Sequence, residues 1–165
     1  MKTMRFFVLS AIFLFSGIIG VGCSGGGEGP IQPPPPVPAA YADKHMPDGW
    51  WTDPEIIEKG RLLFTGEENP DVNCASCHGK DGKPVKRGAR DFRVQDRMKL
   101  YSDSAWFWRV SEGVPRTKMK PWKEKLSEEE IWKVMAYEHA FSHGGTPSPH
   151  DDFTTEFTPE TASAK

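Results

Sequence analysis

The chain has 165 residues, enough for one domain of ordinary size with extended ends, and 37% of these residues are hydrophobic. Its net charge of −2 at pH 7 makes nucleic acid a poor candidate partner. Its three cysteines are one closely spaced pair and one lone residue, which excludes the disulfide framework of a small secreted domain.

Residues 1–22 have the pattern of a secretory signal peptide. Two basic residues precede an apolar run over 6–19, which is too short for a comfortable membrane span. The sequence Gly-Val-Gly-Cys then resembles a bacterial lipobox, with glycine in the place where leucine is usual. We therefore expect export to the periplasmic side of a bacterial membrane and a lipid anchor on Cys23. An ordinary cleaved signal and an uncleaved anchor are the alternatives.

The composition divides the rest of the chain into three parts. Residues 23–41 form a Gly/Pro-rich linker, in which the prolines at 33–36 favour a stiff, extended spacer. Such a spacer suits a tether, and a plain disordered N-terminus has the same composition. Residues 42–141 are the predicted domain, and the polar, turn-rich residues 142–165 are a predicted disordered tail.

Three helices are readable in the domain. The first spans 53–64, with Asp53 as N-cap and a proline at its first position. The second spans 102–113, and the third, 127–141, opens with a capping box of Ser127 and Glu130. No convincing strand pattern is present, so we expect an all-α fold. The long charged loop over 79–101 and the six tryptophans suggest a domain that wraps around a bound cofactor.

The sequence Cys74-Ala75-Ser76-Cys77-His78 is a CxxCH motif, the signature of c-type haem attachment. Two thiols at this spacing reach the two vinyl groups of one porphyrin, and the histidine after them supplies a nitrogen ligand to the iron. The alternatives are weaker, because a thioredoxin-like motif needs βαβ elements and a zinc site needs four ligands. A disulfide between the two cysteines would close a tight, strained loop.

Residues 53–141 resemble a short mono-haem class I cytochrome c. The resemblance is carried by "GRLLF" at 60–64, "CASCHGKDGKP" at 74–84, "GVPRTKMKPW" at 113–122 and "VMAY" at 134–137. It implies an all-α fold of three or more helices around one covalent haem c. It also implies that the first and last helices cross closely, with Val134 and Tyr137 packed against Gly60 and Phe64.

The resemblance also implies a methionine as the second iron ligand. Met119 lies in the loop where the family places this ligand, although Lys120 separates it from the proline that usually follows at once. The carbonyl of Pro84 is expected to accept the other ring N–H of His78. The residues that compete with Met119 as the second iron ligand are the remaining histidines: His45, His139, His143 and His150. The candidates for binding the haem propionates are Trp122, Arg87 and Arg90.

A six-coordinate iron has no position for a substrate, so the sequence predicts a one-electron carrier and no enzyme, with no small-molecule substrate. Residues 80–125 hold 14 basic and 6 acidic side chains, which favours either a solvated mixed surface or a docking face for acidic redox proteins. We expect a membrane-tethered shuttle between respiratory components. The alternatives are a fixed haem subunit of a larger complex, a haem sensor or peroxidase with an open iron site, and a helical domain without haem.

Overall fold

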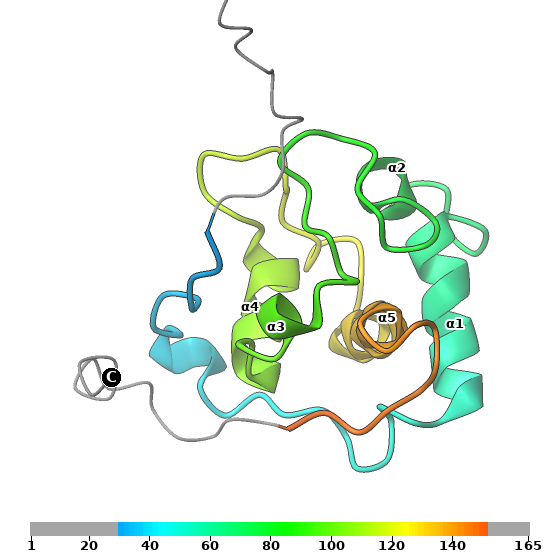
Figure 1. Ribbon diagram of the computed structural model, residues 1–165, viewed down its shortest axis with the longest axis horizontal. Coiled ribbons are helices and arrows are strands. Elements are labelled where there is room, and N and C mark those ends of the chain that lie inside the picture. The colour runs from blue at the N-terminus through cyan, green and yellow to red at the C-terminus, as the bar shows by residue number, and fades with distance from the viewer. Residues whose placement is uncertain (1–29, 152–165) are drawn as a thin grey trace, which may run out of the picture.

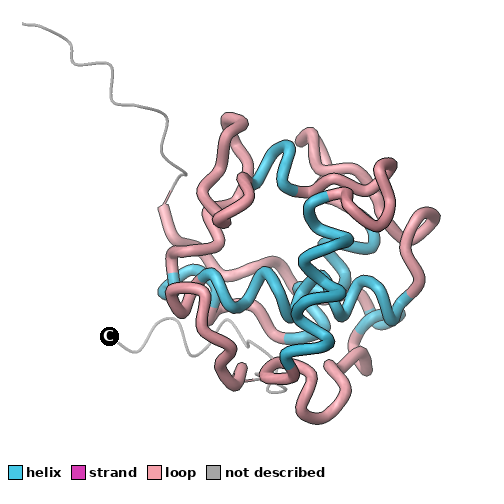
Figure 2. Tube along the Cα trace, turned by 90° about the vertical axis from the view of Figure 1, so that its right-hand side faces the viewer, coloured by secondary structure: helices cyan, strands magenta, loops and turns pink. Residues whose placement is uncertain are grey.

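The computed structural model describes residues 30–151, so the predicted signal peptide and Cys23 lie outside the described residues. Residues 30–151 fold into helices joined by loops and contain no strand (Figure 2). In chain order the helices are η1 (Ala39–Tyr41), α1 (Pro54–Thr65), α2 (Ala75–His78), α3 (Gln95–Met98), α4 (Asp103–Glu112) and α5 (Glu128–Phe141). The predicted all-α fold is confirmed. In the same part of the chain, no helix is both long and apolar enough to cross a membrane.

The start and end of α1 and the start of α5 are fixed by local sequence. The Asp53 carboxylate accepts hydrogen bonds from the backbone N–H groups of Glu55 and Ile56 at the start of α1. Ser127 and Glu130 form the predicted capping box at the start of α5. Gly66 ends α1 in the left-handed conformation, with φ 79°, where glycine carries no steric penalty. These signals need no distant contact, so they could be read from the sequence.

Helices α1 and α5 pack directly against each other at a glycine. A Cβ atom on Gly60 would overlap the backbone carbonyl of Lys133 and lie 3.1 Å from Cβ of Tyr137. The two backbones therefore touch at this point, as the resemblance implied. Figure 1 shows α5 nearly end-on beside α1.

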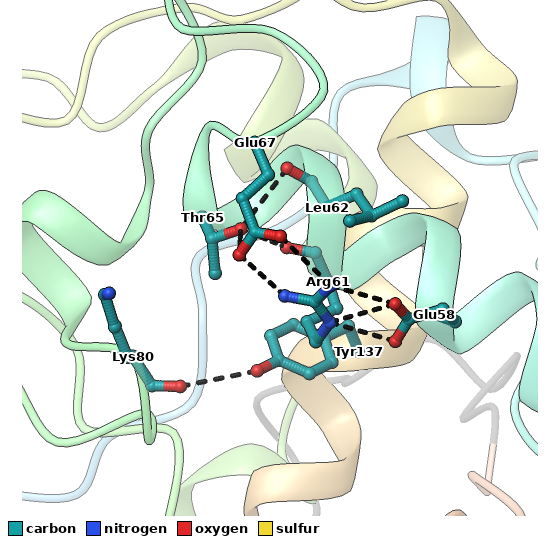
Figure 3. A network of polar contacts seen from close by, with 7 residues as sticks. All are labelled: Glu58, Arg61, Leu62, Thr65, Glu67, Lys80 and Tyr137. Carbon is teal, nitrogen blue, oxygen red and sulfur yellow. Dashed lines mark hydrogen bonds and ion pairs between the residues drawn. The ribbon is translucent and has the colours of Figure 1, made fainter.

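Aromatic side chains extend this contact toward α2. The ring of Phe64 lies 5.3 Å from Tyr137 and 5.7 Å from Phe141, measured between centroids. The hydroxyl of Tyr137 donates a hydrogen bond to the carbonyl of Lys80 at 3.3 Å (Figure 3). The helix crossing is thereby linked to the chain that directly follows His78.

The segment before α1 belongs to the core. Met46 and Trp51 are buried, and the backbone N–H of Met46 donates to the carboxylate of Asp103 at 2.7 Å. Helix α4 packs on α5 through Phe107 and Trp132, whose ring centroids are 4.3 Å apart. The core is therefore closed by residues that precede the first long helix.

The described part of the predicted tail, residues 142–151, also contacts the core. The ring of His150 lies 4.7 Å from that of Trp51, and its Nε2 donates to the carbonyl of Tyr101 at 2.9 Å. The polar composition of this segment gave no sign of this contact, because a histidine makes it. The packed part of the chain thus extends beyond residue 141.

Replacing Gly60 with alanine tests the helix crossing. Gly60→Ala should lower the free energy of unfolding by about 2 kcal/mol or more, because the steric conflict with a backbone carbonyl exceeds the helix-propensity gain of about 1 kcal/mol. Denaturant unfolding measures the change. Lys59→Ala, at the exposed neighbouring position, should change stability by no more than about 0.5 kcal/mol. Equal effects of the two substitutions would contradict a close crossing.

Candidate functional site

Helix α2 places both thiols and the imidazole of the CxxCH motif on a single helical turn. The backbone N–H groups of Cys77 and His78 donate to the carbonyl of Cys74 at 3.0 and 2.9 Å. Asn73 begins the turn by accepting the N–H of Ser76 on its side-chain oxygen at 2.9 Å. The three reactive side chains are therefore fixed relative to one another by local backbone geometry.

The imidazole of His78 is buried and held from one side. Its Nδ1 lies 3.0 Å from the backbone carbonyl of Arg90, twelve residues further along the chain. A carbonyl accepts and never donates, so Nδ1 carries the proton and Nε2 keeps the lone pair that a metal ion needs. The structure thus gives Arg90 the place that the sequence analysis gave to Pro84. The sequence carries no signal for this contact, because every residue has a carbonyl.

The loop after α2 supports the same imidazole with an aromatic ring. Phe92 stacks on His78, with 4.6 Å between centroids and 21° between planes. The backbone N–H of Phe92 donates to the carbonyl of Gly82 at 3.1 Å, which closes the loop. Gly79 follows the helix with φ 75°, and a Cβ there would overlap the carbonyl of Lys83. In the sequence, the one sign of this support is an aromatic residue, Phe92, between the charged residues Asp91 and Arg93.

The two cysteines of the motif are free thiols. Cys74 is buried and Cys77 is half-buried. Burial raises the pKa of the Cys74 thiol strongly, and the negative charge of Glu138 raises it further. A protonated, buried thiol is a poor ligand for a soft metal ion. Within the described residues, no group of three or more His, Cys, Asp or Glu side chains is arranged to hold a metal ion.

Met119 lies in a tight loop between α4 and α5. Gly113 begins this loop with φ 69°, and a Cβ on it would lie 2.5 Å from the carbonyl of Met119. That carbonyl accepts the N–H of Val114 at 3.1 Å, and the N–H of Met119 donates to the hydroxyl of Thr117 at 3.1 Å. The backbone around Met119 is therefore fixed, while its side chain is only half-buried. The other methionines of residues 30–151 are buried in the core: Met46, Met98 and Met135.

The competing histidines pack mainly with one another. His139 lies 4.6 Å from His143 and 4.9 Å from His150 between ring centroids, and it contacts Trp51 at 4.9 Å. Burial, followed by the charges of the two neighbouring histidines, lowers the pKa of His139 to about 3. His139 is therefore neutral at physiological pH. His45 is exposed.

One orphaned donor lies in the loop that carries Met119. The indole Nε1–H of Trp122 is buried without a hydrogen-bond partner, although the backbone N–H of Trp122 is bonded to α4 through Ser111 at 3.1 Å. A buried unpaired donor is costly, so this site fits a bound group that brings an acceptor, as a haem propionate does. Of the other propionate candidates, Arg90 donates to the hydroxyl of Tyr101 at 2.8 Å and Arg87 is exposed.

The free thiol pair, the His78 imidazole with its proton on Nδ1 and the orphaned indole N–H together fit a covalently bound haem. A family model described as "Cytochrome C oxidase, cbb3-type, subunit III" matches residues 62–137, a range that includes Cys74, Cys77, His78 and Met119. A solved c-type cytochrome, KustC0563, is 31% identical over 50% of this chain and 95% of its own length.

The chain belongs to the cytochrome c family. Its cofactor is accordingly covalently bound haem c, and its domain is an electron-transfer domain.

Two further solved structures are similar to this cytochrome. Cytochrome cL from the marine methylotrophic bacterium Methylophaga aminisulfidivorans MPT is 24% identical, covers 56% of this chain and 57% of its own, and has a TM-score of 0.46. A reducing HAO-like protein complex of Kuenenia stuttgartiensis is 18% identical, covers 55% and 45%, and has a TM-score of 0.43, the score that KustC0563 also has. The chain thus spans little more than half of the first of these proteins.

Substitution of the two cysteines tests their role in this cytochrome. Cys74→Ala or Cys77→Ala should leave one vinyl group unsaturated and move the absorption band of the reduced pyridine complex to longer wavelength. The double variant should release its haem into acidified acetone. Ser76→Ala, between the two thiols, should retain the wild-type band. An unshifted band in both single variants would contradict attachment at these residues.

Proposed function

We propose that the protein is a single-electron carrier whose iron is held between His78 and Met119. Haem, when bound, supplies an iron that alternates between the ferric and ferrous states. The observation that carries the proposal is the Nδ1 contact of His78 with the Arg90 carbonyl at 3.0 Å, because it orients the ring and places the lone pair on Nε2. Among the methionines of residues 30–151, Met119 is the one that is not buried in the core. A methionine ligand also raises the reduction potential relative to a second histidine.

The surface beside Cys77 suits a brief contact with a redox partner. Val85 is 66% exposed, and its N–H donates to the carbonyl of Cys77 at 2.9 Å. Exposed basic side chains flank it: Lys83, Lys86 and Arg87. We call these four residues the basic face. An apolar contact ringed by positive charge favours fast, weak association with an acidic protein surface.

The tether is the second part of the proposal. Residues 31–38 contain no regular helix or strand, and Pro38 has extended dihedral angles of −61° and 145°. These values lie in the polyproline range that the proline-rich sequence predicts. A lipid on Cys23 would then hold the carrier at the periplasmic membrane surface and raise its effective concentration near membrane-bound partners.

A fixed haem subunit of a larger complex is the second candidate function. It is favoured by the matching family model, which is named for a subunit of an oxidase, and by the similar protein from an HAO-like complex. Purification from native membranes distinguishes the two roles. A fixed subunit would elute with other chains at constant stoichiometry, whereas a shuttle would elute alone.

Carbon monoxide tests whether the iron has a free position. The visible spectrum of the ferrous protein should not change under carbon monoxide, because His78 and Met119 would both hold the iron and leave no position for it. Met119→Ala should bind it readily. Stoichiometric binding by the wild type would contradict the electron-carrier proposal and favour a sensor or a peroxidase.

Ionic strength tests the basic face. The second-order rate of electron transfer with an acidic redox protein should fall as salt rises, because counter-ions screen the exposed charges. Lys86→Glu should lower the rate at low salt. Lys99→Glu, at the residue that follows α3 and pairs with Asp96, is the matched control and should have a smaller effect. A rate independent of salt would contradict electrostatic docking.

A further inference from the structure

A carboxyl group lies deep inside the domain, where electron transfer alone gives it no role. Glu138 on α5 is 3% exposed, and its Oε2 accepts a hydrogen bond from the indole Nε1 of Trp106 at 3.0 Å. An ionised carboxylate is costly in such surroundings, because one neutral donor replaces little of its hydration. The side chain is therefore poised between its protonated and ionised forms.

Glu138 acts electrostatically on the haem-attachment site. Its negative charge is one of the causes that raise the pKa of the Cys74 thiol, so its charge acts on this attachment position. Two ring contacts connect it to His78 as well. Trp106 stacks on Phe92, with 6.3 Å between centroids, and Phe92 stacks on His78 at 4.6 Å. When Glu138 gains or loses a proton, the change in charge therefore occurs among the buried residues around the cofactor site. Solvent screens a charge there only a little.

The protonation range of Glu138 includes neutral pH. Burial raises its pKa to about 8, and the hydrogen bond from Trp106 opposes this rise. Two neighbouring ionisable groups do not compete with it in this range. Cys74 on α2 becomes a thioether, and His139 on α5 is neutral because burial lowers its pKa to about 3.

Two further ionisable groups lie in the same region. Asp103, on α4 with Trp106, accepts the backbone N–H of Met46 at 2.7 Å. His150, from the C-terminal segment, contacts the Trp106 ring at 6.0 Å and lies 3.8 Å from the carboxylate of Asp103. Helix α1 faces α5 with Gly60 and Phe64, which do not ionise.

We propose that Glu138 is a redox-linked proton acceptor, which binds a proton when the haem iron gains an electron and releases it when the iron loses that electron. One electron passes from a redox protein to ferric iron, and one proton passes from solvent to the Glu138 carboxylate. The reverse step returns both. The ionised carboxylate stabilises the more positive ferric state, and by reciprocal linkage the ferrous state favours the protonated carboxyl.

This inference rests on the proposed electron-carrier function and extends it to proton coupling. The sign of the effect follows from the charge. Above the pKa of Glu138 the carboxylate is ionised and ferric iron is favoured, so the midpoint potential is lower. Below that pKa the group is neutral and the potential is higher. The potential should therefore fall as pH rises through the range around 8 and level off on either side.

The test is the midpoint potential of the haem-loaded protein, measured by redox titration from pH 6 to pH 10. The wild type should show the fall described above. Glu138→Gln keeps an acceptor for Trp106 but cannot ionise, so its potential should stay constant through this range. Glu129→Gln removes a carboxylate from the exposed face of the same helix, where it pairs with Lys133, and it should retain the wild-type curve.

A second variant keeps the test decisive if Glu138→Gln does not fold. Trp106→Phe removes the hydrogen bond that favours the ionised carboxylate, so the fall in potential should move to higher pH. A constant potential in the wild type, or an unchanged fall in Glu138→Gln or Trp106→Phe, would overturn the proposal. A constant potential with an intact haem spectrum would contradict proton coupling at Glu138 but not the electron-carrier function. The absence of haem from the wild type would contradict both proposals.

Discussion

The contact of α1 with α5 at Gly60 is the constraint on which the rest of the structure depends. A side chain at this position would meet the Lys133 carbonyl, so the close crossing requires glycine. The crossing brings Phe64 against Tyr137, and Tyr137 then bonds the carbonyl of Lys80 just after the CxxCH turn. The site is therefore positioned by a helix pair that contributes no proposed iron ligand.

Most of the features that the sequence predicted correctly depend on short stretches of neighbouring residues. The caps at Asp53 and Ser127, the all-α class and the CxxCH turn depend on neighbours within a few residues, and the structure agrees with each of them. Long-range contacts between ordinary groups were not predictable. The Arg90 carbonyl could not be told from any other carbonyl, and Pro84 was preferred to it. The packing of His150 on Trp51 was hidden in a polar segment.

The protein has basic side chains at its surface and a carboxyl group in its core, and the two have different roles. The basic face lies at the surface beside Cys77, where salt and partner proteins reach it. Glu138 lies in the core behind Trp106, where its charge is felt by the cofactor site and little by solvent. The surface charges therefore govern the rate of encounter, and the buried carboxyl governs the energy of the transferred electron.

The central claim is that His78 and Met119 are the two residues that would hold the haem iron. The most direct measurement is the visible spectrum of the purified ferric protein, searched for the weak far-red band of sulfur-to-iron charge transfer. The account predicts that this band is present in the wild type and lost in Met119→Ala, while Met98→Leu, a substitution of a core methionine, retains it. A wild-type spectrum without the band, or a band that persists in Met119→Ala, would contradict ligation by Met119.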